Sequence, residues 1–370
     1  MDVDALTAAG VYDPSAPDAQ DRLELLTELD RFGLSPTTLA AVDREIGLTF
    51  VPILALLDVE GADYTTAEVA AALGVGHDEL QVYLRTAGLP AFAADERPFT
   101  DEDIEMFRVW GAVRDRIGRE LGEQLLRTAG ASCARLAESG IATFVQVTSS
   151  PDVDTGTTDL ERVRYNDESL ATYFAAADSF TTLLRHHMRA ALQRWQIAGE
   201  QSPRQLVRFF VGFVDLVGYT PLSHQLSTDE LSAMLDQFES VALRATAAHN
   251  GRIVKRIGDE VMFVANTVDA ALDIALTMVD EFADPSGATT PRGGVAVGDV
   301  LGREGDFYGP AVNLASRAAD LAVPDEILVS EEVFEAAQAE QLDGFDFVPA
   351  GRRQLKGFPE PVQLWSVSRS

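Results

Sequence analysis

The chain has 370 residues and a formal charge of −30 at pH 7, from 59 acidic and 29 basic side chains. This length accommodates two domains with full hydrophobic cores. The acidity argues against general binding to nucleic acid or to an anionic membrane, because both need a cationic face. Apolar runs fall short of the roughly 20 residues of a membrane span. No export signal opens the sequence, and the single Cys133 fits a reducing compartment, so we expect a cytoplasmic protein.

Residues 1–200 carry mostly helical patterns. Leucines recur at helical spacing over residues 23–29, a similar pattern covers residues 39–46, and a very apolar stretch follows at 48–57. Asp, Ser and Thr stand where these patterns begin, and Gly stands where they end. The sequence therefore predicts an all-helical domain over residues 1–200.

The segment 64–103 resembles the winged helix-turn-helix of bacterial regulators. A threonine cap at Thr65, an apolar helix, a turn at Gly74 and a second helix follow one another. A DNA-reading helix needs basic residues where phosphates would lie, but Asp78 and Glu79 stand there. We interpret the segment as a structural helical hairpin, with DNA binding as a minor alternative.

A long helical pattern over residues 170–197 follows a loop-like stretch at 149–159. We expect Pro203 to end the connection to the second half, so this helix is the candidate transmitter between the two halves. It contains His186 and His187, and histidine is the usual residue of pH-responsive switches. Solvent-exposed histidines without a regulatory role are the ordinary interpretation of that pair.

Strands and helices alternate from Leu206 onward. The order strand, helix, hairpin, helix, strand is that of an antiparallel, ferredoxin-like α+β sandwich, so residues 205–370 are predicted to form an α+β domain. We expect strands at 206–214, 293–300 and 327–329, helices at 222–249, 270–282 and 311–322, and a hairpin at 251–263.

The hairpin at 251–263 carries two features of interest. Residues 257–260 have turn chemistry, which places the carboxylate of Asp259 at the tip. Lys255 comes four residues earlier, and Lys356 is the only other lysine in a chain that otherwise uses arginine. Because an ammonium and a guanidinium are chemically different, two retained lysines suggest specific roles. Codon bias is the ordinary explanation.

Asp215 follows the first strand of this half. Alone, an Asp at a strand end is usually a turn former. Beside Asp259 it would make a two-carboxylate site for a cation such as Mg²⁺, which keeps waters and takes substrate phosphates as further ligands. Two such metals about 4 Å apart favour in-line displacement at phosphorus. The pair thus predicts a reaction at a phosphoryl group.

Asn313 and Arg317 are four residues apart on a predicted helix and so share one face. The amide could orient a sugar, and the guanidinium could neutralise charge on a transferring phosphoryl group. A solvated helix face is the ordinary alternative.

Taken together, residues 207–367 resemble the class III nucleotidyl cyclase catalytic domain. The resemblance implies conversion of ATP into 3′,5′-cyclic AMP and pyrophosphate. It is specific because four motifs occur in the family's order: Phe-x-Asp-Leu-x-Gly-Tyr-Thr at 213–220, Lys-x-x-Gly-Asp-Glu at 255–260, Asp-x-x-Gly-x-x-Val-Asn-x-x-Ser-Arg at 306–317 and Leu-Lys-Gly at 355–357.

The resemblance also implies a metal site and a base-reading site. Asp215, Asp259 and the backbone carbonyl of Leu216 would hold two divalent cations, Mg²⁺ or Mn²⁺. Lys255 and Asp306 would read the adenine edge, which is the adenylyl rather than the guanylyl pairing.

Three further roles are implied by the same resemblance. Asn313 would orient the ribose, Arg317 would stabilise the transition state, and Lys356 would contact the terminal phosphates of ATP. In this family the two sets of residues come from different subunits, so a head-to-tail homodimer with two sites is expected. Asp299 departs from the pattern, because many members have a basic residue at its position.

The N-terminal half is similar to the regulatory domains of some actinobacterial soluble adenylyl cyclases, including ones that respond to pH. This similarity implies that residues 1–200 restrain the cyclase domain through the helix at 170–197.

Two other functions compete with the adenylate cyclase interpretation. A diguanylate cyclase shares the sandwich and an acidic hairpin, but this hairpin lacks the second glycine and the Phe after Glu260, and Asn313 and Arg317 have no place there. The other rival is a catalytically weak or inactive cyclase-like nucleotide sensor or DNA-binding regulator. The full set of site residues argues against it, because a decayed site would be expected to lose members.

Overall fold

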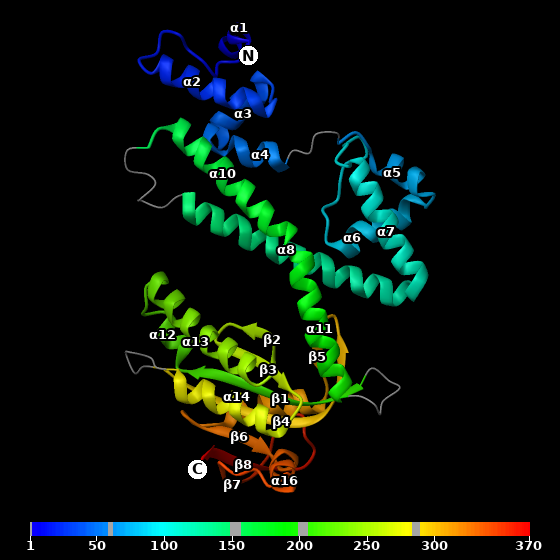
Figure 1. Ribbon diagram of the computed structural model, residues 1–370, viewed down its shortest axis with the longest axis vertical. Coiled ribbons are helices and arrows are strands. Elements are labelled where there is room, and N and C mark those ends of the chain that lie inside the picture. The colour runs from blue at the N-terminus through cyan, green and yellow to red at the C-terminus, as the bar shows by residue number, and fades with distance from the viewer. Residues whose placement is uncertain (1, 58–61, 149–156, 199–205, 283–288) are drawn as a thin grey trace. The chain divides into compact units, whose positions relative to one another are not determined.

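The computed structural model describes residues 2–57, 62–148, 157–198, 206–282 and 289–370. The chain divides into two compact units, Met1–Arg185 and His186–Ser370 (Figure 1). The predicted domain limits at residues 200 and 205, Pro203 and most of the predicted loop at 149–159 lie outside the described residues. Within the described ranges, no helix is both long and apolar enough to cross a membrane.

The first unit is helical, as predicted. One cluster of helices packs around a core in which Leu26, Leu29, Val51 and Val163 are almost fully buried. Its elements are α1 (Val3–Ala8), α2 (Ala19–Leu29), η1 (Asp30–Phe32), α3 (Pro36–Glu45), η2 (Leu48–Phe50), α4 (Val51–Leu57) and α10 (Asp159–Asp178).

A second cluster contains the predicted helical hairpin. Thr65 and Glu68 form a capping box at the start of α5, and Gly74 ends that helix in the left-handed conformation, with φ of 67°. Tyr64 and Phe99 form an antiparallel bridge beside the hairpin. The hairpin is therefore confirmed. The helices of this cluster are α5 (Thr66–Leu73), α6 (His77–Ala87), α7 (Asp101–Ile117) and α8 (Arg119–Thr148).

The helix predicted over 170–197 is interrupted. α10 ends at Asp178, and α11 (Phe180–Ala198) begins two residues later. The hydroxyl of Ser179 donates a hydrogen bond of 2.6 Å to the carbonyl of Ala176. Such local bonds compete with the regular helix ladder. The prediction of one continuous helix is therefore wrong at Ser179.

The second unit is built on one eight-stranded sheet. The strands follow the order β2-β3-β1-β4-β6-β8-β7, and β5 pairs with β4. Only the β4–β6 pair is parallel. The β2-β3-β1-β4 part confirms the ferredoxin-like prediction. The strands are β1 (Leu206–Val217), β2 (Arg252–Ile257), β3 (Glu260–Ala265), β4 (Thr290–Arg303), β5 (Asp306–Tyr308), β6 (Ile327–Ser330), β7 (Phe345–Arg353) and β8 (Val362–Arg369).

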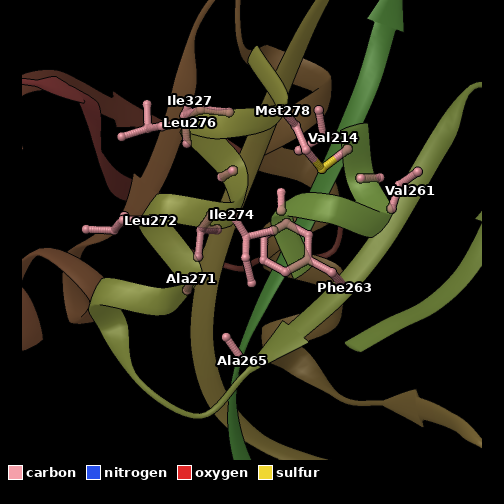
Figure 2. Close-up of a cluster of buried hydrophobic side chains, with 14 of the residues drawn as sticks. Val214, Val261, Phe263, Ala265, Ala271, Leu272, Ile274, Leu276, Met278 and Ile327 are labelled. Carbon is pink, nitrogen blue, oxygen red and sulfur yellow. The ribbon is translucent and has the colours of Figure 1, made fainter. Parts of the chain in front are cut away.

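Helices pack against both faces of this sheet. α13 (Thr228–Ala248) and α14 (Val268–Glu281) cover one face, where Ile274 and Met278 pack with Val214 and Phe263 (Figure 2). α15 (Pro310–Leu321) covers the other face. The unit also contains α12 (Tyr219–Ser223), α16 (Glu331–Ala339) and the part of α11 from His186 onward.

The helix predicted over 222–249 is also divided. Ser227 and Glu230 form a capping box, with the Glu230 carboxylate accepting a hydrogen bond of 2.9 Å from the Ser227 amide. This cap starts α13 afresh after α12, so the predicted single helix is wrong at its N-terminal end.

Gly294 sets the distance between α15 and the sheet. A Cβ atom there would overlap the carbonyl oxygen of Ala315 and the amide nitrogen of Ala319. The backbone of α15 therefore rests directly on β4, and this contact places the residues of α15 relative to the strands.

We expect Gly294→Ala to lower the free energy of unfolding by about 1–3 kcal/mol, because the added methyl forces α15 away from the sheet. The measurement is urea denaturation followed by circular dichroism. Gly302→Ala is the control on the same strand, since its Cβ would meet Phe307 and Trp195 only at 3.5 Å, an ordinary contact. If both substitutions lowered the free energy of unfolding equally, the special role of Gly294 in the contact between α15 and β4 would be contradicted.

Candidate active site

The tip of the β2–β3 hairpin carries Asp259, as predicted. Ile257 pairs with Glu260, so the loop consists of two residues, and its first residue, Gly258, has φ of 64°. On β1, Asp215 lies directly opposite Glu260. The structure therefore brings Asp215 and Asp259, which are 44 positions apart in the sequence (259 − 215), to one place.

This place holds an excess of negative charge. Burial, and then the charge of Asp215, raise the pKa of Asp259 to about 6. Burial, followed by the charges of Asp215, Asp320 and Asp259, raises the pKa of Glu260 to about 7. Ionised carboxylates are thus disfavoured here unless a cation joins them.

The donor set fits a divalent cation such as Mg²⁺. Mg²⁺ is commonly held by one or two carboxylates together with water and substrate phosphate oxygens, and Asp215 and Asp259 supply two. Within the described residues no group of three or more His, Cys, Asp or Glu side chains forms a complete protein cage. Leu216 follows Asp215 and lies one residue beyond the last β1–β3 pair, so its main chain adjoins the carboxylates.

Arg292 was missed by the sequence reasoning. Its guanidinium lies 3.1 and 3.3 Å, through Nη2 and Nε, from Oδ2 of Asp215. It also donates to the carbonyls of Asp320 and Ala322, at 2.9 and 3.0 Å, at the C-terminal end of α15. Arg292 thus supplies positive charge to the carboxylates and joins α15 to β4. The sequence did contain a signal for Arg292, because an arginine is unusual at the start of an apolar strand.

Lys255 and Asp306 form the second part of the site. The Lys255 Nζ lies 2.7 Å from Oδ2 of Asp306, and both side chains are partly buried. The other carboxylate oxygen of Asp306 accepts a hydrogen bond of 2.7 Å from the Phe307 amide. A bulge in β2 between Ile253 and Lys255 helps to set this position. A donor and an acceptor thus stand side by side.

A second arginine, Arg252, supports that pair and was also missed. Its guanidinium donates to the Gly305 carbonyl at 2.5 Å and lies 5.6 Å from the centre of the Phe307 ring. It therefore braces the turn that precedes Asp306. The contact spans 53 positions of sequence, so no local pattern announces it.

Asn313 and Arg317 lie on α15, Asn313 exposed and Arg317 partly so. Arg317 Nη1 is 2.6 Å from Oδ2 of Asp320, one turn further along the helix. Lys356 is exposed in the β7–β8 loop, next to the buried Leu355.

The described residues show no hydrogen bond or ion pair that joins Asn313, Arg317 or Lys356 to the two aspartates. A single chain thus forms the carboxylate pair and the Lys255–Asp306 pair, whereas Asn313, Arg317 and Lys356 make no such direct contact with the aspartates among the described residues. Asp299, at the usually basic position, is exposed on β4 directly opposite Arg208 of β1.

Comparison with known proteins gives consistent matches. Residues 204–368 match the family described as the adenylate and guanylate cyclase catalytic domain. An uncharacterized protein of Mycobacterium tuberculosis is 29% identical over 99% of this chain and 94% of its own. An adenylate cyclase of Streptomyces coelicolor is 32% identical over 72% of this chain and 69% of its own. A pH-sensitive adenylate cyclase of M. tuberculosis is 36% identical over 50% of this chain and 47% of its own.

Proposed function

This chain belongs to the class III nucleotide cyclases, and from that premise we propose that it is an adenylate cyclase that converts ATP into 3′,5′-cyclic AMP and pyrophosphate. The ion pair of Lys255 and Asp306 is the observation that carries the choice of ATP. The adenine edge offers an amino donor beside a ring-nitrogen acceptor. A carboxylate and an ammonium held 2.7 Å apart complement that pattern, since one accepts and the other donates.

The reaction forms a bond between the ribose 3′ oxygen and the α-phosphorus and breaks the bond from that phosphorus to the pyrophosphate oxygen, while the 3′ hydroxyl loses its proton. Asp215, Asp259 and the carbonyl of Leu216 would hold two divalent cations, Mg²⁺ or Mn²⁺. When bound, these ions supply charge stabilisation and acidify the attacking hydroxyl. Asn313 would orient the ribose.

Arg317 would neutralise charge on the α-phosphoryl group, and Lys356 would contact the terminal phosphates. Arg317 must first release Asp320. This costs little, because an exposed ion pair contributes only about 0–1 kcal/mol. A phosphate group carries more charge than one carboxylate and so competes well for the guanidinium.

We propose that the active species is a head-to-tail homodimer. Within the described residues of one chain, no hydrogen bond or ion pair joins Asn313 or Arg317 to the aspartates, and two copies would each supply one part to each of two sites. The hairpin would then contribute Asp259 to one site and Lys255 to the other.

Mn²⁺-ATP should yield cyclic AMP, and Mn²⁺-GTP should yield at least about tenfold less cyclic GMP, because guanine presents the wrong donors to Lys255 and Asp306. Product is measured by chromatography at equal nucleotide concentration. Asp306→Asn, which weakens the hydrogen-bond acceptor, should reduce the ratio of cyclic AMP to cyclic GMP formation. A folded dimer without either product would support the inactive sensor instead.

Asp259→Ala and Arg317→Ala should each reduce cyclic AMP formation by about 100-fold or more. Mixing the two should restore about a quarter of the wild-type activity, because half of the dimers are mixed and each of those has one intact site. The control is a mixture of Asp259→Ala with Asp215→Ala, which damages the same half-site in both chains and should restore nothing. Proven mixed dimers without recovery would exclude shared sites.

We further propose that residues 1–200 restrain the cyclase domain, with pH as the candidate stimulus. The pH-sensitive relative motivates this proposal. A fragment of residues 202–370 should be more active than the full chain and should show a flatter activity profile between pH 5 and pH 8. Equal activity of the two proteins across this range would refute the restraint.

A further inference from the structure

A pocket of about 830 Å³ in the second unit is lined by none of the residues assigned above to metal, base, ribose or phosphate. Its wall is formed by the end of α11, the turn between α13 and β2, and the turn between β3 and α14. The polar lining residues are Gln193, Arg194, His249, Asn250, Asn266 and Thr267. Pockets of this size hold small metabolites.

The lining is depleted of acidic residues. The chain has 59 Asp and Glu residues, yet none of those in the described ranges lines this pocket. Three side-chain amides and one hydroxyl in the lining can donate hydrogen bonds. The hydroxyl is that of Thr267, which makes no side-chain capping hydrogen bond to α14. His249 adds a ring nitrogen 3.8 Å from Asp273. The pocket is therefore an exception to the acidity of the whole protein.

Arg194 is the one permanent charge in this wall. Across the described part of the chain, its guanidinium has no hydrogen bond or ion pair, whereas its main-chain carbonyl accepts a hydrogen bond of 3.0 Å from Asn266. Burial, and then the charge of nearby Arg252, lower the pKa of Arg194. Arg252 is itself partly buried and donates to a neutral carbonyl. Arg194 and Arg252 are thus near enough to repel each other, and among the described residues the guanidinium in the pocket has no partner.

A half-buried cation without a counter-ion is costly, and the cost falls when an anion joins it. We propose that this pocket binds an oxyanion, the phosphate or carboxylate group of a small metabolite, and that Arg194 recognises it. The planar fork of the guanidinium matches two oxygens of either group. The amides of Asn250 and Asn266 and the hydroxyl of Thr267 supply neutral donors around it.

Isothermal titration tests this with the full chain, free of nucleotide and divalent cations. The probes are inorganic phosphate and malonate, with chloride at equal ionic strength as the reference. We expect one saturable site per chain for at least one oxyanion and none for chloride. Binding of phosphate alone would identify a phosphate site, binding of malonate alone would identify a carboxylate site, and binding of both would identify a site for either group. Absence of saturable binding for both would overturn the proposal.

Variants locate the site. Arg194→Gln should weaken binding by at least about tenfold, and Arg194→Lys, which keeps the charge but loses the fork, should weaken it less. Arg189→Gln removes an exposed arginine from the same helix and should leave the affinity within about twofold. Lys356→Gln should leave it equally unchanged. Unaltered binding by both Arg194 variants, or loss in Lys356→Gln, would place the anion elsewhere and overturn the assignment.

Discussion

The register of the three central strands is the constraint on which the candidate site depends. Asp215 of β1 pairs with Glu260 of β3 on one side and with Arg292 of β4 on the other. Three ionisable residues therefore form one row across the ends of β3, β1 and β4. β1 is covered on both faces, by α13 and α14 and by α15. If β1 shifted its pairing register by one residue, the side chain of Asp215 would move to the opposite face of the sheet. The burial of the apolar side chains of β1 therefore also fixes the position of this carboxylate.

Arginines brace the site, whereas the two lysines are proposed to contact substrate. Arg292 joins a carboxylate to the end of α15, and Arg252 joins β2 to the turn before Asp306. Each uses the several donors of a guanidinium to hold backbone carbonyls in place. In this unit, the preference for arginine over lysine thus corresponds to a structural use of arginine, namely contacts with backbone carbonyls.

The sequence predicted the α+β architecture and the meeting of Asp215 with Asp259, because strand periodicity and turn chemistry are local signals. The family resemblance supplied the pairing of Lys255 with Asp306. The breaks at Ser179 and before Ser227 were missed, since each depends on local side-chain hydrogen bonds within a helical pattern, one at Ser179 and a capping box at Ser227. Arg252 and Arg292 were missed as well, because their partners lie far away in the sequence.

Only two side chains in the whole protein carry a primary amine, and both belong to the proposed substrate site. Lys255 is held by Asp306, while Lys356 is exposed on its loop. Reagents that acylate lysine therefore have two side-chain targets of unequal accessibility. Covalent attachment of the protein through its lysines would occupy the nucleotide-binding region, whereas attachment through the exposed Cys133 would modify neither of these two amines.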